Sequence, residues 1–412
     1  MLCRIDFIGK MERYGNKMKV LFINYSYGSG STGRLIYDLI KENSNNEFEF
    51  CVACKKSSIK KENIYIIGNK ISNLYAGLMS RITGLQGYNC LLQTFRLVQF
   101  IKEYNPDVIH LNTIHGNYLN MGILFKYLKS FKGNIIWTLH DCWAFTGNCG
   151  FFNLETDCLK WQKEYCIGCE RKKEYPPSWI FNRSHKMIMD KLKFYAKELD
   201  NLQFVSVSKW MYNCAELSII KKHKNCIIYN WVDLNKFCVK RQKNNKKIKL
   251  IAIASKWSEL KGIKKINDFV ENSRLEFELY IIGYVEKKYI IKNNSRIKYV
   301  GTVNDISSLV DYYNQVDICL SLSLAESFGM TIAEAMACGT PSIVLKKSAS
   351  SEFIDNTGVV IDDYSVENLE AAILKIANNK DTYSQELCRA KAEKLFGKDN
   401  IKNYMKIYAG EL

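Results

Sequence analysis

The sequence lacks any apolar run of the about 18 to 20 residues that a membrane-spanning helix needs. Residues 1–17 carry charges throughout and have no apolar core of the kind found in a secretory signal, and an apolar stretch begins only at Met18. We therefore interpret residues 1–17 as an N-terminal extension and expect a cytoplasmic protein. Peripheral binding to the inner face of the plasma membrane stays open, because the chain is strongly basic.

Acidic residues are few relative to basic ones. Lys and Arg number 59 and Asp and Glu 42, which gives the 412-residue chain a net charge of +17. The excess reflects either a biased composition or an anionic partner, such as a membrane surface or a phosphorylated substrate. The sequence contains no aromatic RNA-binding motif, no zinc-finger spacing and no helix-turn-helix pattern. We therefore expect no nucleic-acid partner.

The sequence also lacks a D-x-D metal-binding triplet and the acidic residue of a complete NAD-binding motif. The chain has no D-x-D triplet that would hold a divalent cation against a nucleotide, so we expect no cofactor for catalysis. Gly28, Gly30 and Gly33 form G-x-G-x-x-G after an apolar strand, a pattern found in dinucleotide-binding proteins. The next strand, however, ends in Lys55 and Lys56 rather than in the acid that holds the ribose of NAD. We interpret the glycines as a loop that lets a phosphate or sugar approach the backbone.

The sequence contains the pattern of an α/β protein, because short apolar strands alternate with amphipathic helices in two successive series. We predict two Rossmann-like domains, each a doubly wound parallel sheet, facing a central cleft. Apolar spacing predicts a long helical region over 71–104 in the first domain. We expect the N-terminal domain at 18–215, with a Cys-rich insertion at 142–169. The interdomain segment is expected at 216–247, the C-terminal domain at 248–390 and a closing helix at 391–412.

The most informative stretch is ESFGMTIAEAMACGTPSIV, which runs from Glu326 to Val344. A buried strand precedes it, and its good helix formers end at Gly339, where a left-handed cap closes a helix. Strand, Gly-containing loop and helix in this order direct backbone N–H groups and the positive end of a helix dipole at a ligand. Glu334, near the helix start, is suited to accept hydrogen bonds from sugar hydroxyls. The pattern predicts a ligand with both phosphates and hydroxyls, such as a nucleotide sugar.

Two other segments add polar groups at strand ends, where ligands of open α/β sheets collect. Lys256 and Lys261 flank the loop SKWSELKG after the first strand of the second domain, and two ammonium groups there can neutralise a diphosphate. Solvated surface lysines are the alternative. His140 ends a strand of the first domain and precedes Asp141. A structural histidine is the alternative there, and we favour a functional one.

Four cysteines, Cys149, Cys158, Cys166 and Cys169, lie close together in the sequence and end in a C-x-x-C pair. Four thiolates satisfy a structural Zn²⁺, although the first two gaps are longer than usual zinc spacing. Reduced thiols in a Cys-rich protein of a reducing compartment are the alternative. Both interpretations stay open.

These residues resemble the GT-B glycosyltransferases of family four, which are retaining enzymes with nucleotide-sugar donors. ESFGMTIAEAMACGTP matches the E-x7-E segment of that family, and SKWSELKG resembles its diphosphate-binding loop. PDVIHLN, TLHDCWAFTG and YNWVDLNKF match weaker landmarks, and the Cys-bearing segment is similar to a subgroup in bacterial exopolysaccharide, O-antigen and colanic acid assembly. The resemblance covers nearly the whole chain from Met18.

The resemblance implies roles by position. Glu334 would bind the nucleotide ribose, Glu326 would lie near the transferred sugar, and His140 would sit beside sugar and acceptor. The implied catalytic residues are Glu326, His140 and Lys261. The implied donor-binding residues are Lys256, Lys261, Gly329, Met330, Thr331, Glu334, Gly30 and Gly33.

Two positions depart from the family pattern. Lys256 stands where Arg is usual, which loses a bidentate donor, and Trp231 replaces the glycine of an N-G-x-D turn. Neither change removes a charge that the reaction needs.

We expect a metal-independent hexosyltransferase of bacterial surface polysaccharide synthesis that uses a UDP- or GDP-sugar and a saccharide acceptor, which is lipid-linked in our preferred interpretation. An anionic membrane surface is an expected further partner. A nucleotide-sugar epimerase, a non-catalytic scaffold of a polysaccharide assembly complex and an NAD-dependent oxidoreductase are the alternatives.

Overall fold

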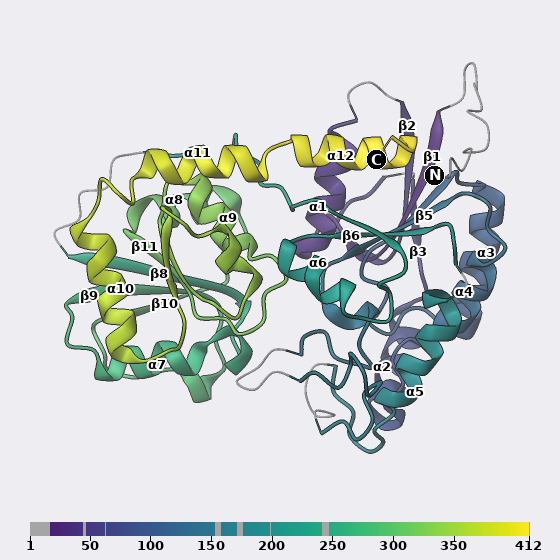
Figure 1. The fold of residues 1–412 in the computed structure, drawn as a ribbon, viewed down its shortest axis with the longest axis horizontal. Coiled ribbons are helices and arrows are strands. Elements are labelled where there is room, and N and C mark those ends of the chain that lie inside the picture. The colour runs from purple at the N-terminus through teal and green to yellow at the C-terminus, as the bar shows by residue number, and fades with distance from the viewer. Residues whose placement is uncertain are drawn as a thin grey trace, which may run out of the picture.

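The computed structural model describes residues 17–43, 47–61, 63–152, 158–170, 176–197, 199–240 and 247–411. It contains two parallel sheets, each flanked by helices, that follow one another along the chain (Figure 1). The predicted pair of Rossmann-like domains is confirmed. Residues 1–16, most of the predicted extension, lie outside the described residues.

The first sheet has the order β3-β2-β1-β4-β5-β6-β7, and every neighbouring pair is parallel. Its strands are β1 (Met18–Tyr27), β2 (Phe48–Ser57), β3 (Ile64–Ile66), β4 (Val108–Leu111), β5 (Asn134–Leu139), β6 (Leu202–Ser206) and β7 (Lys224–Ile227). Its α-helices are α1 (Gly30–Lys41), α2 (Lys70–Thr83), α3 (Leu91–Tyr104), α4 (Met121–Leu128), α5 (Ser184–Lys191) and α6 (Lys209–Glu216).

The second sheet has the order β10-β9-β8-β11-β12-β13 and is also parallel throughout. Its strands are β8 (Ile248–Lys256), β9 (Phe277–Tyr284), β10 (Ile297–Gly301), β11 (Ile318–Ser321), β12 (Ser342–Leu345) and β13 (Gly358–Ile361). The α-helices that follow β7 are α7 (Ile263–Asn272), α8 (Ile306–Gln315), α9 (Met330–Ala337), α10 (Val366–Asn378), α11 (Gln385–Phe396) and α12 (Asp399–Ala409).

Both faces of each sheet are covered, so the central strands are mostly apolar. In β1, Leu21 and Ile23 belong to one apolar core, and Val20 and Phe22 belong to the core on the opposite face. The second sheet likewise separates two cores. The cores thus hold each sheet rigidly while the loops at its carboxyl edge remain free for chemistry.

The order of strands reverses between β1 and β4 in the first sheet and between β8 and β11 in the second. Ligands of doubly wound sheets bind beyond the carboxyl ends of strands at such points. The loop that leaves β1 there leads to Gly30, the first residue of α1, and the segments that follow β8 and β11 carry Lys261 and Glu326. Topology therefore directs attention to the same three loops as the sequence motifs.

The predicted long helical region over 71–104 is two helices instead, α2 and α3. The break begins at Gly84, whose φ of 69° is a left-handed cap, and α3 starts after Cys90, whose φ is 63°. Apolar residues at helical spacing continue across this break, so periodicity alone could not locate it. Helix α3 turns only part of its apolar surface inward, because Leu91, Leu92 and Phe95 are exposed while Leu97 and Ile101 are buried.

The end of the chain returns to the first domain. The closing helix expected at 391–412 is the pair α11 and α12: α11 lies along the second domain and α12 along the first (Figure 1). Tyr404 and Tyr408 of α12 belong to the core that covers β1 and β2. Trp231, which replaces the family glycine, is buried there and meets the Tyr404 ring edge-on at 5.8 Å between centroids. The indole thus fills the junction between the interdomain segment and α12.

Strand β7 lies within the segment 216–247 that we assigned to the connection, yet it pairs with β6 as the last strand of the first sheet. Among the described residues, no helix combines the length and the apolar character that crossing a bilayer requires.

Candidate functional site

The loop between β11 and α9 is shaped by Gly329. Its φ is +99°, and a Cβ at this position would lie 2.3 Å from Ser350 Oγ. Only glycine accommodates both the conformation and the close approach. The loop therefore enters α9 in one conformation. Met330 and Thr331 open the helix, where backbone N–H groups have no acceptor within the helix itself.

Glu326 and Lys261 are brought together by this loop. Lys261 Nζ lies 2.6 Å from Glu326 Oε1, and the two side chains are 35% and 20% exposed. Lys261 comes from the short turn after β8, the neighbour of β11 in the sheet. The ion pair fixes a partly exposed ammonium group at the switch point of the second sheet.

Lys256, in contrast, turns toward Glu286. Its Nζ lies 3.0 Å from Glu286 Oε1, and its side chain is 63% exposed. A solvated pair of this kind is worth little and breaks easily. The two predicted lysines therefore differ in position: Lys261 is held at the site, and Lys256 lies at its rim.

Glu334 is the most strongly perturbed carboxyl group of the site. Tyr313 Oη lies 3.0 Å from Glu334 Oε2 and 3.1 Å from the carbonyl oxygen of Thr331, so these two acceptors share its single hydroxyl proton. Burial raises the pKa of Glu334 to about 7, while the Tyr313 hydrogen bond and the charge of Arg34 act in the opposite direction. Arg34 belongs to α1 of the first domain, so the two domains face each other at this carboxylate.

His140 follows β5 and stands opposite the loop of the second domain. Ser327 Oγ donates a hydrogen bond of 2.6 Å to the backbone carbonyl of His140. The imidazole Nε2 lies 2.9 Å from Asn112 Oδ1, and burial lowers the pKa of His140 to about 4. His140 is therefore neutral at physiological pH and lies next to the loop that carries Glu326.

The glycines of the first domain serve the turn between β1 and α1. Gly30 has a φ of +70°, and a Cβ on Gly33 would lie 2.8 Å from the carbonyl oxygen of Ser26. Gly33 is thus needed for close packing of α1 against β1. Arg34, next in the sequence, is exposed and is the α1 group that acts on Glu334.

A second contact between the domains lies beside the site. The carboxylate of Glu352 accepts hydrogen bonds of 2.9 Å from the backbone N–H groups of Lys209 and Trp210. These are the first residues of α6, so a carboxylate of the second domain completes a helix N-terminus of the first. This contact and the Ser327 contact hold the two carboxyl edges toward each other.

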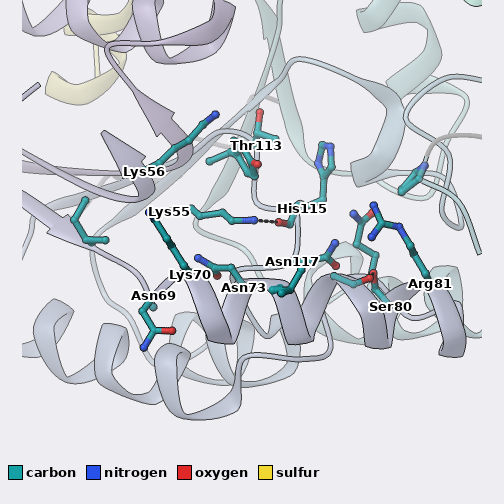
Figure 2. A pocket seen from close by; sticks show the side chains of 18 of the residues that line it. Lys55, Lys56, Asn69, Lys70, Asn73, Ser80, Arg81, Thr113, His115 and Asn117 are labelled. Carbon is teal, nitrogen blue, oxygen red and sulfur yellow. Dashed lines mark hydrogen bonds between the residues drawn. The ribbon is translucent and has the colours of Figure 1, made fainter. Parts of the chain in front are cut away.

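The first domain contains a cavity of about 950 Å³ between its carboxyl edge and α2 (Figure 2). Its lining includes the basic side chains of Lys55, Lys56, Lys70 and Arg81, and none of its described lining residues is acidic. Lys55 donates a hydrogen bond of 3.1 Å to the carbonyl of Gly116, as Figure 2 shows. Such a cavity favours an anionic guest.

The four cysteines predicted to bind zinc line one smaller cavity of about 240 Å³. Among the described residues, no group of three or more Cys, His, Asp or Glu side chains already has the arrangement of a formed metal site. The structure thus brings the four thiols to one cavity, whereas metal binding stays a proposal.

Several site residues were not named as candidates from the sequence: Arg34, Asn112, Tyr313, Ser327, Glu352 and the basic lining of the large cavity. Arg34 directly follows the glycine pattern, Asn112 ends PDVIHLN and Ser327 lies inside the E-x7-E segment, so proximity to a motif was an available signal. Tyr313 lies in none of these motifs and reaches the site through the fold.

The chain is similar in sequence to known glycosyl transferases. Residues 248–379 match the family model of glycosyl transferases group 1. The chain is 23% identical over 270 residues to the "Putative colanic acid biosynthesis glycosyl transferase WcaC" of Escherichia coli (strain K12), an alignment covering 62% of this chain and 64% of the relative. It is 24% identical over 382 residues to an uncharacterized 41.2 kDa protein in the cps region of Klebsiella pneumoniae, covering 88% of this chain and 93% of that one.

The fold is also similar to that of Anabaena Alr3699/HepE, solved in complex with UDP and glucose. The TM-score is 0.63 at 15% identity, over 96% of this chain and 100% of that one. The fold is the GT-B fold, and the match to glycosyl transferases group 1 lies within the second domain.

Proposed function

We propose that this protein is a glycosyltransferase that transfers a hexose, with retention of anomeric configuration, from a UDP- or GDP-sugar to a lipid-linked saccharide in bacterial surface polysaccharide synthesis. The observation that carries the proposal is the meeting of both domains at one place. Ser327 contacts the His140 carbonyl, Glu334 faces Arg34, and Lys261 is held beside Glu326. The colanic acid and cps-region relatives support the polysaccharide assignment.

The donor is placed by three groups of the second domain. The carboxylate of Glu334, positioned by Tyr313, accepts hydrogen bonds from the ribose hydroxyls. The first amides of α9 and the ammonium of Lys261 hold the diphosphate. These charges act where negative charge develops as the nucleoside diphosphate leaves, so the reaction proceeds without a catalytic metal.

The first domain supplies the acceptor side. Neutral His140 offers a hydrogen-bonding imidazole next to the transferred sugar. The acceptor hydroxyl attacks from the face that the leaving group occupied, which retains the configuration. Glu326 is held in an ion pair with Lys261, and neither it nor Glu334 is assigned as a covalent nucleophile.

The large cavity supplies the features of a lipid-linked acceptor site. Its basic side chains suit phosphate groups, and Leu74, which lines the cavity, is 74% exposed. Leu74 belongs to an apolar patch on and beside α2 that we define as Ile71, Leu74, Tyr75, Leu78, Trp179 and Ile180, each at least 45% exposed. Trp179 connects to α2 through a hydrogen bond from its N–H to the carbonyl of Arg81. Apolar groups beside a cationic cavity match an acyl or prenyl chain joined to phosphate.

A panel of UDP-, GDP- and ADP-sugars with lipid-linked and free saccharide acceptors tests the function. We expect one UDP- or GDP-sugar to be consumed only when an acceptor is present. Donor conversion without acceptor would instead indicate an epimerase. Donor binding with no turnover on any acceptor would indicate a scaffold.

The apolar patch predicts binding to anionic membranes. Replacing Leu74 and Leu78 together with glutamate is expected to lower sedimentation with phosphatidylglycerol vesicles at least about tenfold, because burial of each leucine contributes about 1.5 to 3 kcal/mol. Leu374→Glu, at an exposed leucine of α10 in the second domain, is the matched control and leaves binding unchanged. Equal sedimentation of the double variant and the wild type would show that the apolar patch does not bind the membrane.

A further inference from the structure

The Cys-rich segment gathers four thiols around one small cavity. Cys149, Cys158, Cys166 and Cys169 line it together with Phe152 and Trp161, among other residues. Cys149 and Cys169 are hydrogen-bonded to each other, and Cys149 interacts electrostatically with Cys158 and Cys166. The four sulfurs therefore belong to one cluster, although chain gaps of several residues separate the first three.

The backbone at the C-x-x-C pair is shaped to present sulfur atoms. Tyr165, Cys166 and Gly168 all have left-handed φ values, of 47°, 57° and 59°. Such residues wind the chain into a tight turn that brings Cys166 and Cys169 to one side. The backbone N–H of Gly147 donates a hydrogen bond of 3.3 Å to Cys166 Sγ. Amide donors of this kind stabilise sulfur that carries negative charge.

A buried cation lies against this cluster. Lys191, the last residue of α5, is fully buried, and its Nζ donates to the backbone carbonyls of Trp143, Thr146 and Gly147. Its electrostatic neighbours are Cys166, Asp141 and Cys149. Burying an ammonium group is costly unless negative charge compensates it, and the carbonyl dipoles and Asp141, which also contacts His115, supply only part of that compensation.

We propose that Cys149, Cys158, Cys166 and Cys169 bind one structural zinc ion and that Lys191 is the buried countercharge of the tetrathiolate. On binding, the four thiols release their protons to solvent, and four thiolates on Zn²⁺ carry a formal charge of −2. The protonated lysine reduces the charge of the buried assembly to −1. Zinc–sulfur bonds of about 2.3 Å require the side chains to turn further into the cavity than they do now.

The proposed ion stabilises the surroundings of the glycosyl-transfer site. The segment begins at Cys142, two residues after His140, and Phe152 stacks on Trp210 at 5.7 Å between ring centroids. Trp210 is one of the two residues whose N–H groups hold Glu352 of the second domain. Zinc would thus fix the wall that carries both His140 and an interdomain contact.

Metal analysis of the full chain tests the site without any activity assay. We expect stoichiometric zinc in the purified protein, and thiolate-to-cobalt charge transfer with the strong d–d absorption of a tetrahedral site after replacement by Co²⁺. Cys166→Ser and Cys169→Ser are expected to lose the metal. Cys226→Ser, at a half-buried cysteine of β7, is the matched control and keeps it. Folded wild-type protein that holds no zinc and gives no thiolate–cobalt absorption would overturn the proposal.

The role of Lys191 is tested by the rate at which a chelator removes zinc. Lys191→Met is expected to lose zinc about 10 to 100 times faster than the wild type, the range seen when groups supporting a metal site are removed. Lys191→Arg keeps the charge and is expected to stay near the wild-type rate. If Lys191→Met does not fold, Lys191→Gln replaces it in the comparison with Lys191→Arg. Equal rates of zinc loss in Lys191→Arg and in the uncharged variant would show that Lys191 is not the countercharge of the site.

Discussion

Lys261→Ala is expected to lower kcat about 10²- to 10³-fold while the protein stays folded. The lysine is held 2.6 Å from Glu326 at the switch point of the second sheet, where the leaving diphosphate develops charge in the proposed reaction. Loss of one preorganised group that stabilises such charge costs about 2.7 to 4 kcal/mol in the transition state. Steady-state kinetics at saturating donor measures the effect.

Lys264→Ala is the matched control for this prediction. Lys264 lies one turn further along the chain, is 65% exposed and pairs with Glu259 rather than with Glu326. Its replacement is expected to leave kcat unchanged. A Lys261→Ala enzyme with the wild-type kcat would show that another group stabilises the leaving diphosphate.

Glu334→Ala is expected to weaken donor binding about 10- to 100-fold. The carboxylate is the proposed acceptor for the ribose hydroxyls, and hydrogen bonds to charged groups contribute about 1.5 to 3 kcal/mol. Isothermal titration with the donor nucleotide measures the change, and Glu367→Ala, at an exposed glutamate of α10, is the control. Unchanged nucleotide affinity in Glu334→Ala would remove the ribose assignment.

Glu334→Gln tests the perturbed pKa of Glu334 through protein stability, because glutamine does not titrate. Burial raises the pKa of Glu334 from an ordinary 4.5 to about 7, so the folded state retains a proton that the unfolded state has lost between these values. The stabilisation from this proton is complete below the unfolded pKa and disappears as the pH rises through about 7. The melting temperature of the wild type should therefore fall, relative to that of Glu334→Gln, between about pH 5 and about pH 8. A difference in melting temperature between the two proteins that does not depend on pH would contradict the raised pKa of Glu334.

Local patterns predicted the elements of the site well. The segment from Glu326 to Val344 holds a glycine loop and a helix, as its composition indicates, and the four cysteines that lie close together in the sequence line one cavity. Each of these features depends on residues close in sequence. Gly329, in particular, is explained by one left-handed φ and one close approach.

Contacts between distant segments were not predictable in the same way. The break at Gly84 follows apolar residues that continue the helical spacing, and the return of α12 to the first domain depends on packing that a closing-helix pattern does not specify. The hydrogen bond from Ser327 to His140 joins residues 187 positions apart. Such contacts arise from sheet topology, which local propensity does not encode.

The most direct test of the account is the anomeric configuration of the product, measured by NMR on an acceptor glycosylated by the full chain. The account predicts transfer from a nucleotide sugar in which the new glycosidic bond has the configuration of the donor. An inverted product, or donor turnover that does not depend on an acceptor, would contradict it.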